Sequence, residues 1–578
     1  MNAHRAIPQT STTTGGEPGS GKPLDAISIE LVRNGFHSIC DEMAESLIRS
    51  SHSPNIKERR DCSCCLYTSD GDIVVQAEHI PIHLGVMAVA MRHILDRYPI
   101  ETMRPGDAFL VNDPYYGANH LPDFIVTGPL FLDGTLVGFG ASMAHHTDVG
   151  GATPRSMPAT ATEIFHEGLR IPPVRLAQAG VTDENMLTII AANSRLPDER
   201  MADLDAQIAT IRVAQSRIEE MGRRYNPDEL RHASSEIIRL SESAMRARVS
   251  ALPADTWRGE AIADFGPQSI PIKVALRRDG DRLVVDFAGT GDQTVSPFNS
   301  CMANTLASVF MAVRVSIATD IPANAGMYRA LDIVVPEGSI LNPRFPSAIS
   351  AATQVSYHTF EALMAAFAAL APDQILAGTG GGGVFSFGGI NPANGRLFAY
   401  GEARGGGSGA SAVADGESGV IPPVANLHDT PVEVLEMSLP VRIERYELVE
   451  GSAGAGRQRG GFGLRRAFRM LTPVRCAFQV SMPTRGPAGL DGGEPGSPTR
   501  ITVFHPDAPV ERVTRFGELT ASAGTLIEIE TAGGGGFGPA AARDPDSKHQ
   551  DQLGGYGMEG SKAIRPSTAT TTTTGGAA

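Results

Sequence analysis

Long hydrophobic runs are missing from this sequence of 578 residues. No stretch of about 18 or more consecutive apolar residues is present, which is the length that a membrane-spanning helix needs. Residues 1–23 also lack an apolar core after their few basic residues, so they do not fit a signal peptide. These absences predict a cytoplasmic protein without membrane association.

Positive charge and cysteine are also scarce. Lys and Arg number 49 against 64 Asp and Glu, for a net charge of −15, and no basic cluster is interleaved with aromatic residues. This pattern argues against a nucleic-acid surface. The six cysteines, among them Cys62, Cys64 and Cys65, lack the second pair of a zinc knuckle. We expect reduced, buried thiols here rather than a metal or redox site.

Common catalytic signatures are absent as well. The sequence has neither an H-E-x-x-H helix motif nor a G-x-S-x-G elbow. The segment "GEPGSGKP" at residues 16–23 matches half of a phosphate-binding loop, but Pro23 stands where Ser or Thr is needed and no strand precedes it. We therefore predict no nucleotide site in this chain.

The length exceeds what one hydrophobic core normally supports, so several substructures are expected. The hydrophobic patterns predict an α+β fold of mixed type, with antiparallel, hairpin-rich sheets, a helical insertion and a β-rich C-terminal part. The expected segments are a disordered tail (1–24), a metal-site α+β region (25–182), a helical segment (183–250), an α+β region (251–375), a Gly-rich β region (376–540) and a second disordered tail (541–578).

Three local patterns refine this division. Asp25 precedes apolar residues at three- and four-residue steps as far as Leu47, which predicts a capped helix. Residues 184–248 are helical in pattern with a break at Asn226-Pro227, which predicts a helical hairpin. The glycine-rich segments 378–384, 405–411 and 531–538 are expected to form tight turns with left-handed φ rather than phosphate cradles.

Two hairpins follow from Asp-Gly turn signals. Folding at Asp70-Gly71 brings Cys62 near His79, so Asp61 and His79 share one end. Folding at Asp133-Gly134 makes Pro122 face His145 and His120 face Thr147, which places His120 and His145 on one sheet face. Asp123 is one step out of phase, so a bulge or bend is expected near Pro122.

The second hairpin suggests a metal site. Seven of the fifteen histidines lie between residues 79 and 166, and His120, Asp123 and His145 meet at one end of the hairpin. Imidazole and carboxylate ligands together suit Zn, Mn or Fe. The same pattern is equally typical of structural histidines at the start of a strand, and spacing alone leaves both interpretations open.

Nine blocks carry a resemblance to a known family. They are "SPNIKERRDCSCCLYTSDGDIVVQAEHIPIHLG", "NDPYYGANHLPDFIV", "AHHTDVGG", "DFAGTGDQ", "PEGSILNP", "HDTPVEVLE", "RIERYEL", "GAGRQRGGFGLRR" and "GGGGFG". In this order, over about residues 25–540, they resemble the hydantoinase B/oxoprolinase family, which includes B subunits of ATP-dependent hydantoinases, 5-oxoprolinases and lactamases, and large subunits of acetone and acetophenone carboxylases.

The resemblance implies a division of labour. A partner A subunit with an actin-like nucleotide fold would use ATP to phosphorylate a cyclic amide, and this chain, as the B subunit of a hetero-oligomer, would complete ring opening at a divalent metal. The implied ligands are His120, Asp123 and His145, together with Asp61, which the resemblance alone supplies. The alternatives are a ketone carboxylase subunit and a non-catalytic scaffold for the A subunit.

Proton transfer and phosphate binding have further candidates. His146 or His79 is expected to act as general acid or base. The alternative for His146 is to orient a metal ligand. Lys57, Arg59 and Arg60 could hold a phosphate, but the favoured interpretation is a solvated or ion-paired charge run.

Overall fold

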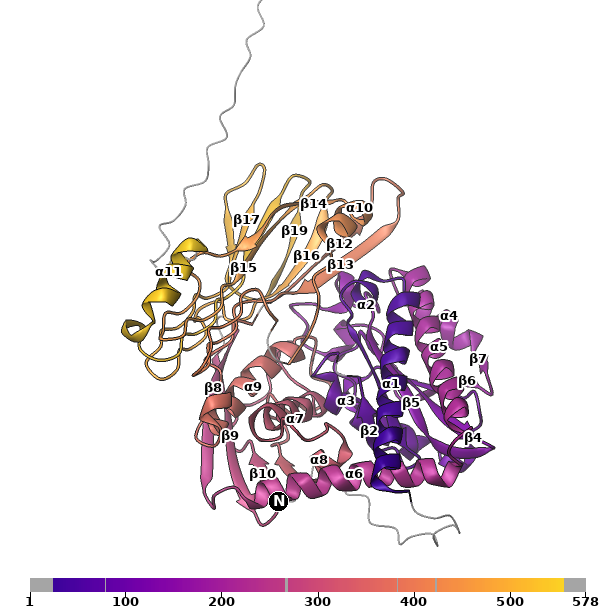
Figure 1. The fold of residues 1–578 in the computed structure, drawn as a ribbon. Helices are drawn as coiled ribbons and strands as arrows, with labels where there is room; N and C mark the ends of the chain where they lie inside the picture. The colour runs from indigo at the N-terminus through magenta and orange to yellow at the C-terminus, as the bar shows by residue number, and fades with distance from the viewer. Residues whose placement is uncertain (1–23, 78, 266–268, 382, 422–423, 556–578) are drawn as a thin grey trace, which may run out of the picture.

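A computed structural model describes residues 24–77, 79–265, 269–381, 383–421 and 424–555. Three units are visible in Figure 1: an N-terminal α/β unit, a central unit beside it, and a β-rich C-terminal unit that covers one end of both. Residues 1–23 of the tail predicted at residues 1–24, including the segment that matches half of a phosphate-binding loop, lie outside the described residues, and so do residues 556–578. Residues 545–553, in the first part of the segment expected as a C-terminal tail, instead form a helix, α11.

The N-terminal unit is built on a seven-stranded antiparallel sheet in the order β2-β1-β5-β4-β3-β6-β7. Its strands are β1 (Cys62–Thr68), β2 (Ile73–Gln76), β3 (Ala108–Val111), β4 (Asp123–Leu132), β5 (Thr135–His145), β6 (Val174–Gln178) and β7 (Val181–Thr182). The helices around it are α1 (Ala26–Ser50), α2 (Pro54–Lys57), α3 (His83–Arg97), α4 (Glu184–Ala192) and α5 (Pro197–Met221), with short 3-10 turns η1 (Ile100–Thr102), η2 (Pro114–Tyr116), η3 (Pro154–Ser156) and η4 (Ile164–His166).

The first helix forms as its sequence predicts. The Asp25 side chain accepts a hydrogen bond from the Ser28 amide (2.8 Å), which satisfies a free N–H of the first turn. The apolar face from Val32 to Leu47 is buried against the sheet and α5. The expected helix and its cap are confirmed.

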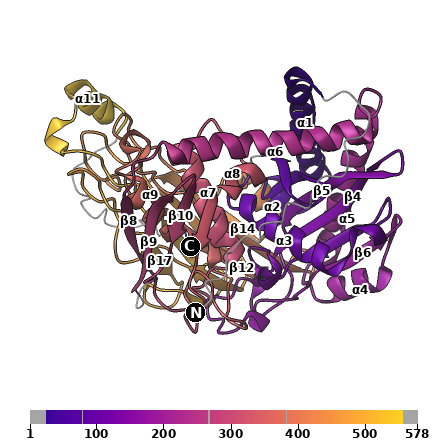
Figure 2. The same cartoon turned by 90° about the horizontal axis from the view of Figure 1, so that it is seen from below.

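The predicted helical hairpin is wrong in its packing. After the break at Asn226, α6 (Pro227–Ser250) begins with a capping box between Asn226 and Glu229. Both α5 and α6 pack on α1, but α6 then continues past the N-terminal sheet to α8 and β10 of the central unit. Figure 2 shows α6 running across the two units. The helix thus joins two cores rather than folding back on α5.

The central unit pairs a four-stranded sheet with two apolar helices. Its strand order is β11-β10-β9-β8, and only the β10–β11 pair is parallel within the described residues of this sheet. The elements are β8 (Thr256–Asp264), β9 (Ser269–Asp279), β10 (Arg282–Asp286), β11 (Leu331–Val334), α7 (Met302–Ile317), α8 (Ala325–Arg329), α9 (Ala352–Phe367) and η5 (Pro372–Gln374). Helix α9 packs on β8 and β9, and α7 lies between α9 and α3, so α7 connects the central and N-terminal cores.

The C-terminal unit has two antiparallel sheets, in the orders β13-β12-β16-β19 and β14-β15-β20-β17-β18. Phe385, Phe387, Phe468 and Phe478 pack together in the core between them. The elements are β12 (Val384–Ile390), β13 (Leu397–Ala403), α10 (Val432–Ser438), β14 (Val441–Leu448), β15 (Leu464–Met470), β16 (Val474–Gln479), β17 (Arg500–Phe504), β18 (Glu511–Val513), β19 (Gly517–Ala521), β20 (Leu526–Glu530), η6 (Ala540–Ala542) and α11 (Pro545–Leu553). The α+β prediction with a β-rich C-terminal part is confirmed.

The glycine-rich segments serve a different purpose from the one expected. Of their described glycines, only Gly538 has a left-handed φ (71°). The others let extended segments lie against one another: a Cβ at Gly407 would be 1.9 Å from the carbonyl oxygen of Gly461, and one at Gly534 would be 1.8 Å from that of Ser408. Close backbone approach, not turn geometry, explains these glycines.

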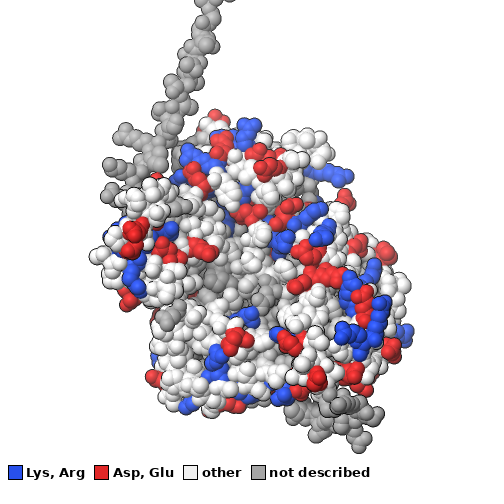
Figure 3. All heavy atoms as spheres, viewed as in Figure 1, with Lys and Arg blue, Asp and Glu red and all other residues white. Residues whose placement is uncertain are grey.

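Three expectations from composition can be compared with the structure. All six cysteines are free and buried, as predicted. Acidic and basic side chains are intermixed over the face in Figure 3. Within the described residues, none of the helices combines the length and apolar character needed to cross a membrane.

Candidate metal centre

The second hairpin has the predicted turn but a different register. Leu132 pairs with Thr135 across Asp133 and Gly134, whose φ values of 50° and 77° suit a type I′ turn. A bulge between Leu130 and Phe131 then shifts the ladder by one residue, so that Asp123 pairs with His145. The expected pairing of Pro122 with His145 is wrong, because the bulge lies near the turn and not near Pro122.

His120 reaches the site through a tight turn before β4. The Asp123 amide donates to the His120 carbonyl (3.0 Å), which folds His120 back over Asp123. Asn112 fixes this loop by donating to the Leu121 carbonyl (2.7 Å) and accepting from the Ile171 amide (2.6 Å). At Gly117, with φ of 104°, a Cβ would lie 2.4 Å from the Ala90 amide of α3, so only glycine fits.

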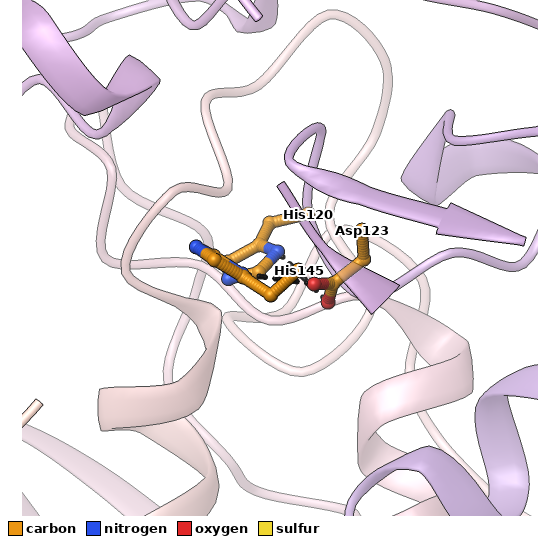
Figure 4. Close-up of side chains that lie close together, drawn as sticks. All are labelled: His120, Asp123 and His145. Carbon is orange, nitrogen blue, oxygen red and sulfur yellow. Dashed lines mark hydrogen bonds and ion pairs between the residues drawn. The ribbon is translucent and has the colours of Figure 1, made fainter. Parts of the chain in front are cut away.

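Three side chains meet as Figure 4 shows, with both imidazoles facing one carboxylate. His120 Nδ1 lies 2.9 Å from one Asp123 oxygen, and His145 Nδ1 lies 2.9 Å from the other. One potential ligand atom from each residue lies within 4.8 Å of the others. All three residues are buried. We call His120, Asp123 and His145 the HDH cluster.

Burial and charge act in opposite directions on the HDH cluster. Burial alone would lower the pKa of His120, but the carboxylates of Asp123 and Asp61 outweigh it and raise that pKa. Burial and the charge of His120 lower the pKa of His145 to about 3. The pKa of Asp123 is lowered despite burial, because both imidazoles favour its charged form. An ionised carboxylate beside a neutral imidazole is what a cation requires.

Several buried atoms of the HDH cluster have no hydrogen-bond partner among the described residues. These atoms are His145 Nε2, His120 Nδ1 and Asp123 Oδ2. The last two are 2.9 Å apart but poorly aligned, so we treat the contact as an ion pair rather than a hydrogen bond. Buried polar atoms are normally hydrogen-bonded, and nitrogen and oxygen atoms that lack such bonds suit Zn, Mn or Fe as ligands. The donor set therefore fits a divalent metal.

Asp61 lies beside the HDH cluster but outside it. Its backbone carbonyl accepts from the His145 amide (3.0 Å), and its carboxyl group is buried. Burial and the charge of Asp123 raise the pKa of Asp61 to about 6. Its oxygens do not belong to the group of ligand atoms within 4.8 Å. The charge of Asp123 thus disfavours ionisation of a second carboxyl group held near the two imidazoles.

The expected acid-base histidines point elsewhere. His146 Nε2 bonds Gln207 Oε1 of α5 (2.7 Å), and its ring packs on Phe124. His79 is half-buried within the influence of Asp41 and Glu45 of α1, and burial lowers its pKa. Neither histidine joins the HDH cluster. The first hairpin has the predicted register, since Cys65 pairs with Gln76 and Leu66 with Val75, but its ladder ends before Asp61 and His79.

The expected phosphate-binding run is structural. Arg59 donates to the carbonyls of Gly401, Ala403 and His428 and to the Asn55 side chain, at 3.1–3.3 Å, and so ties α2 to the C-terminal unit. Arg60 pairs with Glu45 at 3.2 Å, and Lys57 is exposed. These three residues therefore match the alternative interpretation, a charge run that is solvated or bonded to other parts of the protein.

Sequence reasoning did not single out three further residues near the HDH cluster. His83 is buried with Nδ1 3.0 Å from Ser63 Oγ, and burial lowers its pKa to about 4. Glu167 accepts from the amides of Ile349 and Ser350 (both 2.7 Å), and burial raises its pKa to about 7. The charge of buried Arg155 acts on both cluster histidines. Only His83 had a signal, its place in the histidine-rich segment.

A cavity of about 290 Å³ adjoins this region. It lies between the start of α5, the β12–β13 hairpin and α10, and Asn55, Thr147, Glu199, Tyr400 and Gly401 are part of its wall. Asn55 also donates to the His145 carbonyl (3.3 Å), so the wall is directly bonded to the last residue of β5. The size suits a small molecule.

Comparisons with known proteins agree over most of the chain. The description "Hydantoinase B/oxoprolinase" belongs to a family model that matches residues 25–540. An uncharacterized protein of Methanocaldococcus jannaschii is 33% identical, with 90% of this chain and 92% of that protein covered. A putative D-/L-hydantoinase of the B type from Pseudomonas sp. is 29% identical, with 93% of each chain covered. 5-Oxoprolinase PfmaA of Pestalotiopsis fici is 30% identical over 93% of this chain, which spans 43% of that protein.

Two solved structures share the fold. The ATP-dependent caprolactamase from Pseudomonas jessenii aligns with a TM-score of 0.84 and 26% identity, with 93% of this chain and 95% of that chain covered. Acetone carboxylase in its nucleotide-free form aligns with a TM-score of 0.85 over 93% of this chain and 78% of that one, but at 19% identity it supports the fold alone. The family match and the relatives lead to one conclusion: the chain belongs to the hydantoinase B/oxoprolinase family.

Proposed function

We propose that the chain is the B-type subunit of an ATP-dependent amidohydrolase that opens a lactam, hydantoin or 5-oxoproline ring. The observation that carries the proposal is the HDH cluster, a buried N/O donor set with unpaired atoms in a chain of this family. Relatives named as a hydantoinase and a 5-oxoprolinase, and the structure of a caprolactamase, favour cyclic amides.

In this proposal the work is divided between two subunits. A partner A-type subunit uses ATP to phosphorylate the ring, and His120, Asp123 and His145, with Asp61 beside them, would hold a Zn, Mn or Fe ion in this chain. Such an ion would supply Lewis-acid chemistry, by lowering the pKa of water and polarising a substrate oxygen. The chain's own contribution is to hold two imidazoles in place for the metal, to keep Asp123 ionised, and to exclude bulk water from the site.

The ketone carboxylase alternative has weaker support. Acetone carboxylase shares the fold at 19% identity, whereas the relatives named for cyclic amides are 26–30% identical. A non-catalytic scaffold for the A subunit would need no metal donor set. We therefore favour the hydrolase.

The test is reconstitution with an A-type partner chain from the same organism. The complex is assayed for ATP-dependent opening of lactams, hydantoins and 5-oxoproline, and for ketone carboxylation with bicarbonate. We expect ring opening that is lost in His120→Ala and kept in Arg442→Met, an exposed residue of β14. Bicarbonate-dependent ATP turnover on ketones alone would contradict the hydrolase, and full activity of His120→Ala would indicate a scaffold.

A further inference from the structure

The guanidinium of Arg155 is buried and forms no ion pair within the part of the chain that the structure describes. Its side chain is 3% exposed, and its Nε has no hydrogen-bond partner among the described residues. Nη1 contacts the sulfur of Met157 at 2.8 Å, and the charges of Asp61 and Glu402 act on this guanidinium without a direct contact among the described residues. Burial of a charge in this state is unfavourable unless something else compensates it.

The backbone around Arg155 is strained. Arg155 has φ of 73° and Ser156 has φ of 56°, a left-handed pair in which neither residue is glycine. Buried Asp148 holds this turn by accepting from the Arg155 amide (2.9 Å), and Ser156 Oγ donates to the Gly150 carbonyl (2.7 Å). Such strain persists only where the surroundings enforce it, and it is concentrated at functional sites.

The turn directs Arg155 between the HDH cluster and the C-terminal unit. Its charge acts on Asp61, His120 and His145. On the other side it passes β13, where a Cβ at Gly401 would lie 2.1 Å from Arg155 Cδ. The missing side chain at Gly401 therefore leaves the space that this arginine occupies, and Gly401 also lines the adjoining cavity.

Four buried arginines gather around this site, although the whole chain has a net charge of −15. They are Arg59, Arg155, Arg404 and Arg466, and the buried carboxyl groups near them include Asp61, Asp123 and Glu402. Glu402 is paired with Arg404 and Arg466, and Arg59 is bonded to four protein oxygens. Arg155 and Asp61 are the members of this group whose charged atoms have neither an ion pair nor a hydrogen bond to nitrogen or oxygen among the described residues, and the charge of each acts on the other.

We propose that Arg155 binds an oxyanion, either a phosphoryl group or a carboxylate, near the HDH cluster. The planar guanidinium offers two parallel donors that match the oxygens of either group. This inference deepens the proposed function, because it assigns the anionic part of the ligand to a residue outside the metal ligands. Gly401 is a positioning residue, since it leaves room for Arg155 to reach the site.

The test is anion binding by the full-length protein, measured by calorimetry at constant ionic strength with inorganic phosphate and, separately, acetate. We expect one of these anions to bind the wild type and Arg442→Met equally, and to bind Arg155→Met about 10- to 100-fold more weakly, as for a lost charge-assisted hydrogen bond. Arg155→Lys should fall in between, because it keeps the charge and loses the fork. Gly401→Ala should weaken binding as Arg155→Met does.

The two anions distinguish a phosphoryl site from a carboxylate site. Tighter binding of phosphate identifies a phosphoryl site, and tighter binding of acetate identifies a carboxylate site. Equal affinity of wild type and Arg155→Met for both anions, or no binding by the wild type, would overturn the proposal. As a control, circular dichroism and metal affinity are measured for each variant to establish that it is folded. If the metal or the ring opening fails while Arg155-dependent anion binding remains, the proposed function falls and the anion site stands.

Discussion

Asp123 and His145 are directly paired across the β4–β5 ladder, and their side chains meet with Oδ1 and Nδ1 2.9 Å apart. The turn at the start of β4 adds His120 to the other oxygen of the same carboxylate. The HDH cluster is therefore fixed by backbone hydrogen bonds of one hairpin. A metal bound there would meet a prearranged site.

The first prediction concerns how metal affinity depends on pH and on Asp61. Metal ions compete with protons for imidazoles, and the pKa of His120 is raised above its ordinary 6.5. Metal affinity should therefore begin to fall, as pH decreases, at a higher pH than for an ordinary histidine. We expect Asp61→Asn to weaken metal binding at least about tenfold at pH 7.5, because the metal would lose a charged ligand. Metal affinity is measured by competition with a chelator.

The outcome also separates two roles of Asp61. If Asp61 acts only through its charge on His120, its removal lowers the pKa of that imidazole. Metal would then be retained to lower pH, with unchanged affinity at pH 7.5. That result would contradict its role as a ligand.

His146 is the subject of a second prediction. Its bond to Gln207 is part of a buried network, since Gln207 Nε2 also donates to the carbonyls of Phe124 (2.9 Å) and Ser142 (3.2 Å). His146→Phe should lower the free energy of unfolding by about 1–3 kcal/mol, because Gln207 Oε1 loses its partner. Turnover per folded molecule should change less than about tenfold, whereas loss of an acid-base catalyst costs about 10²–10⁴-fold.

Denaturant unfolding and the steady-state rate of the reconstituted complex measure both quantities. Gln207→Leu is the matched variant, and the double variant should be less destabilised than the sum of the two. A thousandfold loss of turnover in folded, metal-loaded His146→Phe would restore His146 as the general acid or base.

The glycine layers give a third prediction. Gly534→Ala should destabilise the chain by at least about 3 kcal/mol or prevent folding, because the new Cβ would overlap the Ser408 carbonyl and backbone cannot yield as a side chain does. Gly517→Ala in β19 is the control, with its nearest atom 3.9 Å away, and should change stability by less than about 0.5 kcal/mol. Equal melting temperatures for the two variants would refute the role of close backbone approach.

The cysteines give a fourth prediction. All six thiols are buried, and burial raises the pKa of Cys65 and of Cys301 to about 12. A thiol-specific reagent at pH 8 should label the native protein hardly at all, because the reactive thiolate is scarce and inaccessible. In denaturant it should label all six. Rapid labelling of the native protein would show a reactive cysteine that the structure does not explain.

The sequence predicts the local features of the site, but not the register of the β4–β5 hairpin. Asp133-Gly134 indicates the turn, and the histidine spacing brings His120 and His145 to one end. The bulge that pairs Asp123 with His145 lies opposite Gly138, which packs closely on the neighbouring strand β1. A Cβ at Gly138 would lie 2.3 Å from the Tyr67 carbonyl of that strand. That neighbour is distant in sequence, so the hairpin alone does not reveal the register.

Two of the three residues that sequence reasoning missed lie outside the long helices and the strands, Arg155 in the turn η3 and Glu167 directly after η4. Arg155 and Glu167 have no periodic pattern, and their burial depends on β13 and on the segment before α9, which fold against them from other units. For His146 the sequence leaves the direction of the side chain open. Neighbouring residues at a strand end face opposite sides of a sheet, so His145 turns to the HDH cluster while His146 turns to α5.

The most direct test of the metal centre is X-ray diffraction from crystals of the metal-loaded protein, recorded at the absorption edge of the bound metal. The account predicts one strong anomalous peak within about 2.0–2.3 Å of ligand atoms of His120, Asp123 and His145. Crystals of Asp123→Ala should lack it. A metal-loaded protein with no anomalous peak at the HDH cluster, or with its peak at another place in the chain, would contradict the account.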